Sequence, residues 1–305
     1  MSTRKYLIVR PKYGLCNQLY SISKGIIFGL LSDRDIFFSG FQLDYRDENN
    51  LCEFHDIIDI DYLQKIINKY KIKIYSDLNI KGKKIVTGCD TNISLIREFI
   101  SLLFHENNIN EKILDIDNPI SAIIPDEYNT LNYYIDLNIK FIKKYNDIAD
   151  KIINGLNLKN YCCIHLRLED DAIKHMKYSS NKDLDLEIFN DICKKKYLDK
   201  LDNLKSLNVK IYICTSLIID KHFNNDFYLE IKDKYNLIDK NNIIDINIEC
   251  DCREIYGIID FIIAKKSSFF IGIDWSSFSL YLYNTHKYNK KGAEMINVWE
   301  DISKL

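Results

Sequence analysis

YCCIHLRL, residues 161–168, is the stretch of this sequence that decides the fold class. Its apolar run predicts a strand, and the spacing of the apolar positions in residues 184–207 predicts a helix after it. Residues 209–216, VKIYICTS, predict the next strand. A strand, a helix and a strand in this order are typical of an α/β domain built on a parallel sheet.

The same alternation continues on both sides of this stretch. Toward the C-terminus the pattern predicts helices at 221–235, 253–264 and 276–283, strands at 243–246 and 269–272, and a last helix at 293–305. In the first half it predicts strands at 5–10, 35–40, 71–75 and 83–87, a helix from Asn17 to about residue 32, and further helices at 57–70, 93–104 and 135–153. The chain is therefore expected to be α/β throughout.

The length of 305 residues fits two domains. The helix predicted at 135–153 ends near Gly155, and we place the boundary there. This divides the chain into residues 1–155 and 156–305, each with its own strands and helices.

Composition excludes several classes of protein. The chain has 42 basic and 44 acidic residues, a formal net charge of -2, so a nucleic-acid partner is not expected. No window approaches about 18 consecutive apolar residues, and the N-terminal apolar stretch is too short for a signal peptide. We therefore expect a cytoplasmic protein without a membrane span. Cys250 and Cys252 form a C-x-C pair, but no second Cys or His pair lies near enough to complete a zinc site.

Three groups of polar residues follow predicted strands, where the ligand crevice of a parallel α/β sheet lies. The first is residues 14–19, GLCNQL. Gly14 lets the backbone come close to a ligand, and the N–H groups at the start of a helix favour an anionic or carbonyl group. The alternative is that Asn17 only caps the helix. Neither the dinucleotide-binding fingerprint nor the phosphate-binding loop motif is present.

The second group is residues 165–171, HLRLEDD. On a strand, His165 and Arg167 point to one side and the leucines to the other. An arginine suits a phosphate, because its planar fork donates two parallel hydrogen bonds and stays charged. The alternative is an internal salt bridge between Arg167 and one of the acids just after it.

The third group is residues 269–279, FFIGIDWSSFS. The predicted strand breaks at Gly272, and a helix starts at Ser276 and Ser277. Hydroxyls and N–H groups at a helix N-terminus form an anion site, although Ser276 could simply cap the helix. Together with Arg167 in the same domain, this group indicates a pyrophosphate ligand.

The order and spelling of these groups resemble the superfamily of GDP-fucose-dependent fucosyltransferases, which includes protein O-fucosyltransferases and the α1,2- and α1,6-fucosyltransferases. Residues 14–19 resemble its G-x-x-N-Q motif, and His165-Leu166-Arg167 with the acids after it is similar to the H-L-R-x-E-x-D of the O-fucosyltransferase branch. Asp260 followed by residues 270–272 and 276–279 is similar to an acidic residue followed by F-I-G and S-S-F-S.

The resemblance implies a GT-B-like architecture with two facing Rossmann-like domains. Residues 1–155 would bind the acceptor, and residues 156–305 would bind GDP-fucose, with the last helix packing back on the first domain. The activity implied is metal-independent, inverting transfer of fucose to a hydroxyl of a glycan or of a protein Ser or Thr.

The resemblance also implies roles for individual residues. Arg167 would stabilise the leaving diphosphate, while Ser276, Ser277 and the N–H of Phe278 would hold its phosphates. Asp260 or His165 would contact guanine or ribose. Gly14 and Asn17 would lie across the cleft, with Asn17 positioning the sugar or the attacking hydroxyl. Glu169 is a catalytic candidate by position, but a carboxylate beside an arginine is a poor base.

Two alternatives stay open. One is a catalytically silent module of the same fold that binds a GDP-sugar or a glycan. The other is a transferase that uses a different nucleotide sugar. Neither the acceptor nor the general base follows from the sequence.

Overall fold

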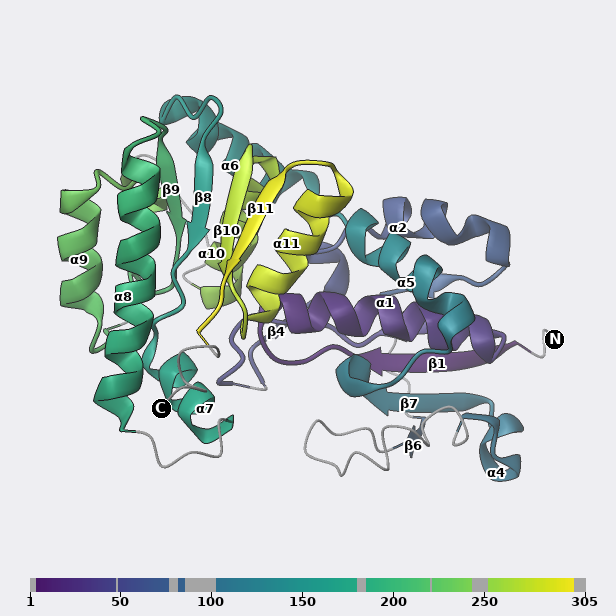
Figure 1. Cartoon of the computed structure of the whole chain (residues 1–305). Helices are drawn as coiled ribbons and strands as arrows, with labels where there is room; N and C mark the ends of the chain where they lie inside the picture. The colour runs from purple at the N-terminus through teal and green to yellow at the C-terminus, as the bar shows by residue number, and fades with distance from the viewer. Residues whose placement is uncertain are drawn as a thin grey trace. The chain divides into compact units, whose positions relative to one another are not determined.

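The structure is a computed structural model that describes residues 4–47, 49–76, 82–85, 103–179, 185–219, 221–242 and 252–298. The chain divides into two compact units, Met1–Lys143 and Lys144–Leu305. Each unit is built on its own parallel sheet (Figure 1). None of the helices that the described residues form has the length and the apolar character that a membrane crossing requires.

The first unit contains a sheet in the order β5-β2-β1-β7-β6, in which every neighbouring pair is parallel. Its strands are β1 (Lys5–Arg10), β2 (Arg34–Phe38), β5 (Ile74–Tyr75), β6 (Lys83–Ile85) and β7 (Ile113–Asp117). The central strand β1 is buried along Leu7, Ile8 and Val9, as expected for a parallel strand covered on both faces.

Helices and a short hairpin complete the first unit. They are α1 (Leu15–Leu31), α2 (Ile60–Ile67), α4 (Glu106–Ile109), α5 (Asp126–Asn138), the 3-10 turns η1 (Phe54–Asp56), η2 (Asn68–Tyr70) and η3 (Pro119–Ser121), and the antiparallel strands β3 (Phe41–Gln42) and β4 (Leu51–Cys52). Helix α1 follows β1 directly, as the sequence predicts, and packs on β1, β2 and α5.

The second unit contains a parallel sheet in the order β11-β10-β8-β9. Its strands are β8 (Cys162–His165), β9 (Ile211–Cys214), β10 (Phe269–Ile273) and β11 (Gly292–Ile296). Its helices are α6 (Lys143–Gly155), α7 (Asp170–Ser179), α8 (Leu186–Lys205), α9 (Asn225–Lys234), α10 (Arg253–Lys266) and α11 (Ser277–Tyr288), with the 3-10 turn η4 (Lys240–Asn242).

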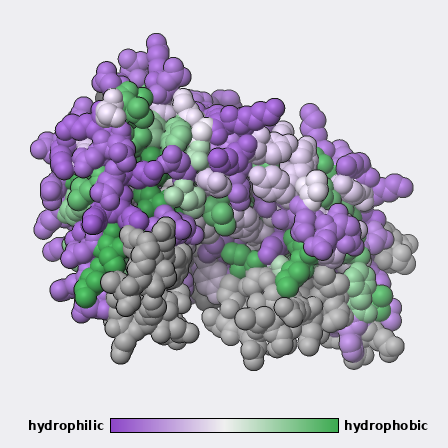
Figure 2. All heavy atoms as spheres, in the orientation of Figure 1, coloured by the Kyte–Doolittle hydropathy of each residue, from purple (hydrophilic) through white to green (hydrophobic). Residues whose placement is uncertain are grey.

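Hydrophobic residues gather beside α8 in Figure 2, in the region where Figure 1 places β8 and β10. An apolar groove of about 370 Å³ runs there, and its walls include Leu204 of α8, Leu207 just after that helix, and Phe269 and Ile271 of β10. The groove starts at the end of the sheet opposite to the one that carries the polar groups found in the sequence.

The helix predicted at 135–153 is wrong as a single element. Helix α5 ends at Asn138, and α6 begins at Lys143. Between them Ile139 and Phe141, two residues apart, are both buried, and Phe141 forms an isolated bridge with Ile58. This extended segment supplies apolar residues at positions that also suit a helix, which is why the periodicity does not show the break.

The last helix predicted at 293–305 is also wrong within the described residues, because Gly292–Ile296 form strand β11. Residues 299–305, the strand predicted at 243–246 and most of the helix predicted at 93–104 lie outside the described residues. The unit boundary at Lys143 precedes the one placed at Gly155. Helix α6 therefore belongs to the second unit, where Asp150 pairs with Lys266 of α10.

Candidate active site

The carboxyl edge of the second sheet brings together two of the three polar groups found in the sequence. Strand β8 ends at His165, just before Arg167, and β10 ends at Ile273, just before Ser276. The two strands are parallel neighbours, so both ends lie at the same edge. The chain continues from β8 to β9 on one side and from β10 to β11 on the other. This is a topological switch point, where open α/β sheets bind ligands.

His165 is buried at this edge and connects β8 to α11. Its Nδ1 lies 2.8 Å from Ser279 Oγ, and the same oxygen accepts the backbone N–H of Ile273 at 2.9 Å. The ring packs against Phe278 with 4.6 Å between ring centroids. Burial lowers the pKa of His165 to about 3, so the imidazole is neutral at physiological pH. His165 thus holds the start of α11, and the contact with guanine or ribose that the resemblance implies stays a prediction.

The third motif, residues 269–279, has a glycine at position 272 because Ser279 packs closely against β10 there. A Cβ at this position would lie 2.6 Å from Ser279 Cβ and 2.9 Å from Met295 Sδ. Only a glycine lets Ser279 come close enough to β10 to bond both Ile273 and His165. Ser279 is a functional position that the sequence analysis did not select, although it closes the S-S-F-S spelling.

We expect Gly272→Ala to destabilise the protein by about 1–3 kcal/mol, because the added methyl group has no room. The measurement is urea unfolding. The matched control is Gly14→Ala, since a Cβ at Gly14 meets no atom within 4 Å among the described residues. The control changes only a helix N-cap and is expected to cost less than about 1 kcal/mol. Equal losses in the two variants would contradict the packing argument.

The N-terminus of α11 combines a helix cap with N–H groups that remain available. Ser276 is the N-cap, and its Oγ accepts the backbone N–H of Ser279 at 3.4 Å, so the capping alternative is correct. The backbone N–H groups of Ser277 and Phe278 have no acceptor among the described residues. The cap therefore does not exclude an anion, which would meet these two N–H groups and the positive end of the helix dipole.

Arg167 forms the salt bridge that the sequence left open. Its Nη1 donates to Glu169 Oε2 and its Nη2 to Asp171 Oδ2, each at 2.9 Å. The backbone N–H of Arg167 donates to Tyr197 Oη at 3.0 Å, which fixes the chain just after β8. The Arg167 side chain is nonetheless 22% exposed. The guanidinium is held by carboxylates on one side and still reaches the surface of the second unit.

Glu169 is a buried carboxylate with hydrogen bonds to both of its oxygens. Its Oε1 accepts the backbone N–H of Ser216 at 3.1 Å and also the Ser216 hydroxyl. Burial would raise the pKa of Glu169, but the charges of Arg167 and Arg253 outweigh it and lower the pKa to about 2. Glu169 holds the Arg167 guanidinium in place, and the catalytic role expected for it stays a prediction.

Arg253 is a second residue near the site, after Ser279, that the sequence analysis did not select. It starts α10, and its Nη2 lies 3.5 Å from Ser216 Oγ. Its charge acts on both Glu169 and His165. Two guanidinium groups thus flank one buried carboxylate. The only signal in the sequence was an arginine at a predicted helix start.

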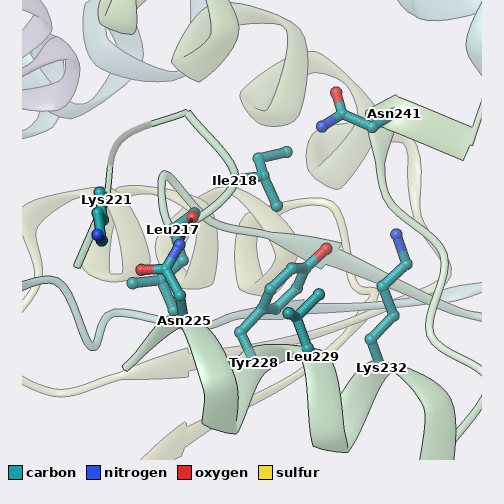
Figure 3. A pocket seen from close by; sticks show the side chains of 8 residues that line it. All are labelled: Leu217, Ile218, Lys221, Asn225, Tyr228, Leu229, Lys232 and Asn241. Carbon is teal, nitrogen blue, oxygen red and sulfur yellow. Dashed lines mark hydrogen bonds between the residues drawn. The ribbon is translucent and has the colours of Figure 1, made fainter. Parts of the chain in front are cut away.

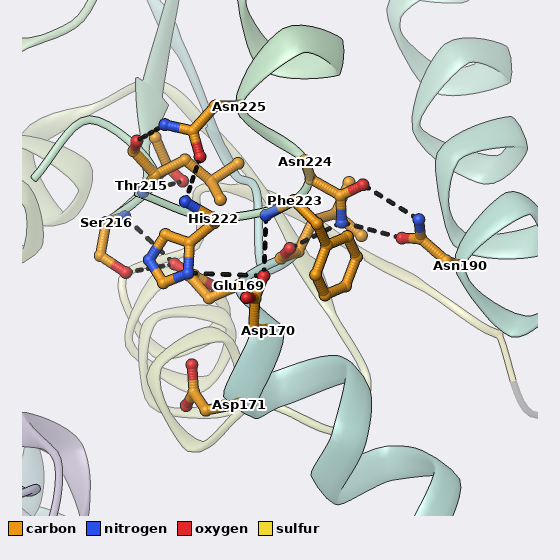
Figure 4. Close-up of polar contacts among 12 residues, drawn as sticks. Glu169, Asp170, Asp171, Asn190, Thr215, Ser216, His222, Phe223, Asn224 and Asn225 are labelled. Atoms are coloured by element: carbon orange, nitrogen blue, oxygen red, sulfur yellow. Dashed lines mark hydrogen bonds and ion pairs between the residues drawn. The ribbon is translucent and has the colours of Figure 1, made fainter. Parts of the chain in front are cut away.

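A network of polar contacts holds the segments after β8 and β9 together (Figure 4). Asp170, the first residue of α7, accepts the backbone N–H of Phe223 at 3.0 Å. Asn224 donates to the backbone oxygen of Leu168 at 2.8 Å and exchanges hydrogen bonds with Asn190 of α8. The loop that carries Arg167 is therefore fixed by its neighbours before any ligand binds.

A pocket of about 410 Å³ lies between the segment after β9 and helix α9 (Figure 3). Leu217 and Ile218 come from the segment, and Tyr228 and Lys232 come from α9. Tyr228 and Lys232 both bond the buried carboxylate of Asp239, which fixes this wall. The pocket begins at Leu217, the residue after Ser216, and so lies beyond the carboxyl end of β9.

Asp260 is bound inside the second unit, and its expected contact with guanine or ribose stays a prediction. It is buried in α10, where Oδ1 accepts from Tyr212 Oη at 2.8 Å and Oδ2 accepts from Lys240 Nζ at 2.6 Å. Burial raises the pKa of Asp260 although Lys240 opposes the shift. Both oxygens are committed to this buried cluster, so Asp260 holds α10 against β9 and η4.

In the first unit, Asn17 is the third residue of α1 and does not cap it, because the N-cap is Gly14 and no side chain caps that helix. The carboxamide of Asn17 makes no hydrogen bond to another described residue. Gly14 has φ -62°, and the left-handed residue of the turn is Tyr13, with φ 71°. Neither its conformation nor a close neighbour among the described residues requires a glycine at position 14.

No group of three or more His, Cys, Asp or Glu residues within the described ranges is placed to hold a metal ion. Cys250 of the C-x-C pair lies outside those ranges.

Two Rossmann-like units, one with arginines and a helix N-terminus at its switch point, define a GT-B-like protein. The sequence model of the family described as GDP-fucose protein O-fucosyltransferase matches residues 42–289. The chain belongs to this family, so the resemblance found in the sequence is confirmed. No curated protein matches the chain in sequence.

Solved structures confirm the fold. POFUT1 in complex with GDP-fucose is similar with a TM-score of 0.64 at 14% identity, covering 97% of this chain and 99% of that one. The fucosyltransferase NodZ from Bradyrhizobium is similar with a TM-score of 0.58 at 13% identity, covering 92% and 93%. The α/β, GT-B-like fold with parallel sheets is therefore correct.

Proposed function

We propose that this chain transfers fucose from GDP-fucose to a hydroxyl acceptor, without a metal ion and with inversion at the sugar carbon. The observation that carries the proposal is the carboxyl edge of β8 and β10, where the exposed part of Arg167 and the available N–H groups of Ser277 and Phe278 lie at one switch point. The family of the chain gives the donor class.

The reaction requires stabilisation of the negative charge that develops on the departing GDP. Arg167 would supply a fixed positive fork for this charge, and Glu169 holds the fork in place. Ser276 and the first turn of α11 would hold the phosphates through N–H groups and the helix dipole. Arg253 would add a second positive charge to the same edge.

A general base is not part of this proposal. Glu169, with a pKa of about 2, cannot accept a proton from a hydroxyl at neutral pH, and Asp260 is bonded to Lys240 and Tyr212. On the acceptor side, Asn17 offers an unused carboxamide that would orient a hydroxyl. The transition state would then depend mainly on charge stabilisation of the leaving group.

The test is a panel of GDP, GDP-fucose, GDP-mannose, UDP and ADP in thermal unfolding with EDTA present, followed by an assay of GDP release and fucose transfer. A ligand at 100 times its Kd stabilises the fold by about 2.7 kcal/mol, so binding is readily seen. We expect GDP and GDP-fucose to stabilise, and turnover to be unaffected by EDTA. Stabilisation by UDP or GDP-mannose in place of GDP-fucose would assign another donor.

A silent GDP-sugar-binding module is the second candidate. The observation that favours it is the pairing of Arg167 with two carboxylates, Glu169 and Asp171. Binding of GDP-fucose without any release of fucose, over glycan and peptide acceptors alike, would establish this second function.

A further inference from the structure

The first unit has its own pocket at the switch point of its sheet. Strand β1 lies between β2 and β7, so the chain leaves β1 on one side and β7 returns on the other. A pocket of about 380 Å³ opens at the carboxyl ends of these three strands. Its walls include Arg10 and Lys12 after β1, Ser39 after β2, and Asp117 at the end of β7. A volume of this size is at the lower end of what small-molecule sites need.

The charged side chains of this pocket are balanced. Arg10 donates to both oxygens of Asp115, at 2.8 and 2.7 Å, and Lys12 lies 3.1 Å from Asp117. Two cations and two carboxylates leave no net charge, so a phosphate or another anion gains little here. The wall is mainly polar, so a lipid does not fit either.

Groups for hydrogen bonding nevertheless remain in the pocket. Arg10 Nη1 makes no hydrogen bond to any described residue, and the Arg10 side chain is 38% exposed. Each oxygen of Asp115 accepts one hydrogen bond from Arg10, and a carboxylate oxygen can accept more than one. Donors and acceptors side by side without net charge suit a ligand whose groups both donate and accept, which is the chemistry of sugar hydroxyls.

The pocket is rigidly joined to the Gly14–Asn17 turn. Gln42, which lines the pocket, accepts the backbone N–H of Tyr13 at 2.7 Å through Oε1. Gln18 donates to the backbone oxygens of Tyr13 and Gln42, both at 2.8 Å, and accepts the Gln42 N–H. The glutamine of the G-x-x-N-Q motif therefore locks the turn that carries Asn17 to the pocket wall.

We propose that this pocket binds a neutral saccharide, and that the acceptor is a glycan and not a folded protein. The proposal rests on the proposed transferase function and names its acceptor class. A concave polar pocket encloses a sugar ring, whereas a Ser or Thr on a folded domain presents a single hydroxyl on a convex surface. The sugar would lie beside Asn17, the side chain with an unused carboxamide.

The test uses saturation-transfer NMR on the full chain with N-acetylglucosamine, galactose, glucose and lactose as probes. The double variant Lys12→Met/Asp117→Asn removes one charge pair without changing shape, and Ser39→Tyr fills the pocket. Lys65→Met, at an exposed position of α2, is the matched control. GDP-fucose affinity is measured for every protein, and thermal unfolding confirms that each one folds.

We expect at least one probe to bind the wild type and Lys65→Met, and to bind both pocket variants at least 10-fold more weakly, with GDP-fucose affinity unchanged. The proposal is overturned if none of the four probes binds the wild type, or if the pocket variants bind the probes as well as the wild type does. It is also overturned if the protein fucosylates a peptide and the pocket variants leave that activity intact. If the wild type does not bind GDP-fucose, the proposed transferase function is overturned instead. Failure of the saccharide proposal and failure of the proposed function are therefore distinguishable.

Discussion

Arg167→Lys is expected to lower kcat/KM for fucose transfer by about 100- to 1,000-fold, while the affinity for an acceptor stays within a few-fold. Removing one group that stabilises developing charge typically costs about 2.7–4 kcal/mol in the barrier. Lysine keeps the charge but not the planar fork. In the structure each Nη of Arg167 bonds a different carboxylate, and a single ammonium group cannot replace both contacts. The measurement is steady-state kinetics of GDP release.

Two further variants separate catalysis from folding. Arg167→Ala alone leaves the Glu169 carboxylate buried without its partner and is expected to destabilise the fold. Arg167→Ala/Glu169→Gln removes both charges and should fold, yet remain as inactive as Arg167→Lys. Arg46→Lys, in an exposed pair with Asp44, is the control for an arginine that the reaction does not use. Near wild-type turnover by Arg167→Lys would show that the guanidinium has only a structural role.

The sequence predicts most of the second sheet because its signals are local. Buried parallel strands such as β8 and β9 are short apolar runs, and helices such as α10 have apolar residues at helical spacing. Strand β11 was missed because its pairing with β10 is a long-range property that periodicity does not contain. The α5–α6 break was missed because the extended residues Ile139 and Phe141 mimic a helical face.

For the site, the sequence predicts which residues lie at the strand ends better than it predicts the chemical role of each one. Arg167 and Ser276 do lie at neighbouring strand ends, since the carboxyl ends of parallel strands meet at one edge. Whether a carboxylate there is a base or a support depends on which groups surround it in space. Arg253 and Ser216 come from distant segments, and together with Arg167 they determine that the pKa of Glu169 falls. The sequence of residues 165–171 alone does not predict that the pKa of Glu169 is lowered.

Lys240→Met is expected to lower the free energy of unfolding by about 3–5 kcal/mol, because it leaves Asp260 buried without its cation. In the wild type, Lys240 Nζ donates to Asp260 and to the backbone oxygen of Thr215, and both side chains are almost fully buried. Burial already raises the pKa of Asp260 above its unfolded value, and without Lys240 it must rise further. The folded state of the variant then binds more protons than the unfolded state above about pH 4, so its stability should fall as pH increases. The measurement is urea unfolding between pH 4.5 and 8.

The double variant Lys240→Met/Asp260→Asn tests whether Asp260 has a structural role or contacts the nucleotide. The double variant removes both buried charges, so it should regain most of the lost stability and lose the pH dependence of Lys240→Met. If Asp260 only holds α10 against β9, this stable variant binds GDP with nearly the affinity of the wild type. If Asp260 contacts guanine or ribose, as the motif suggested, GDP binding falls at least 10-fold although the fold has recovered. The structure favours the first result, since Tyr212 and Lys240 already occupy both oxygens of the carboxylate.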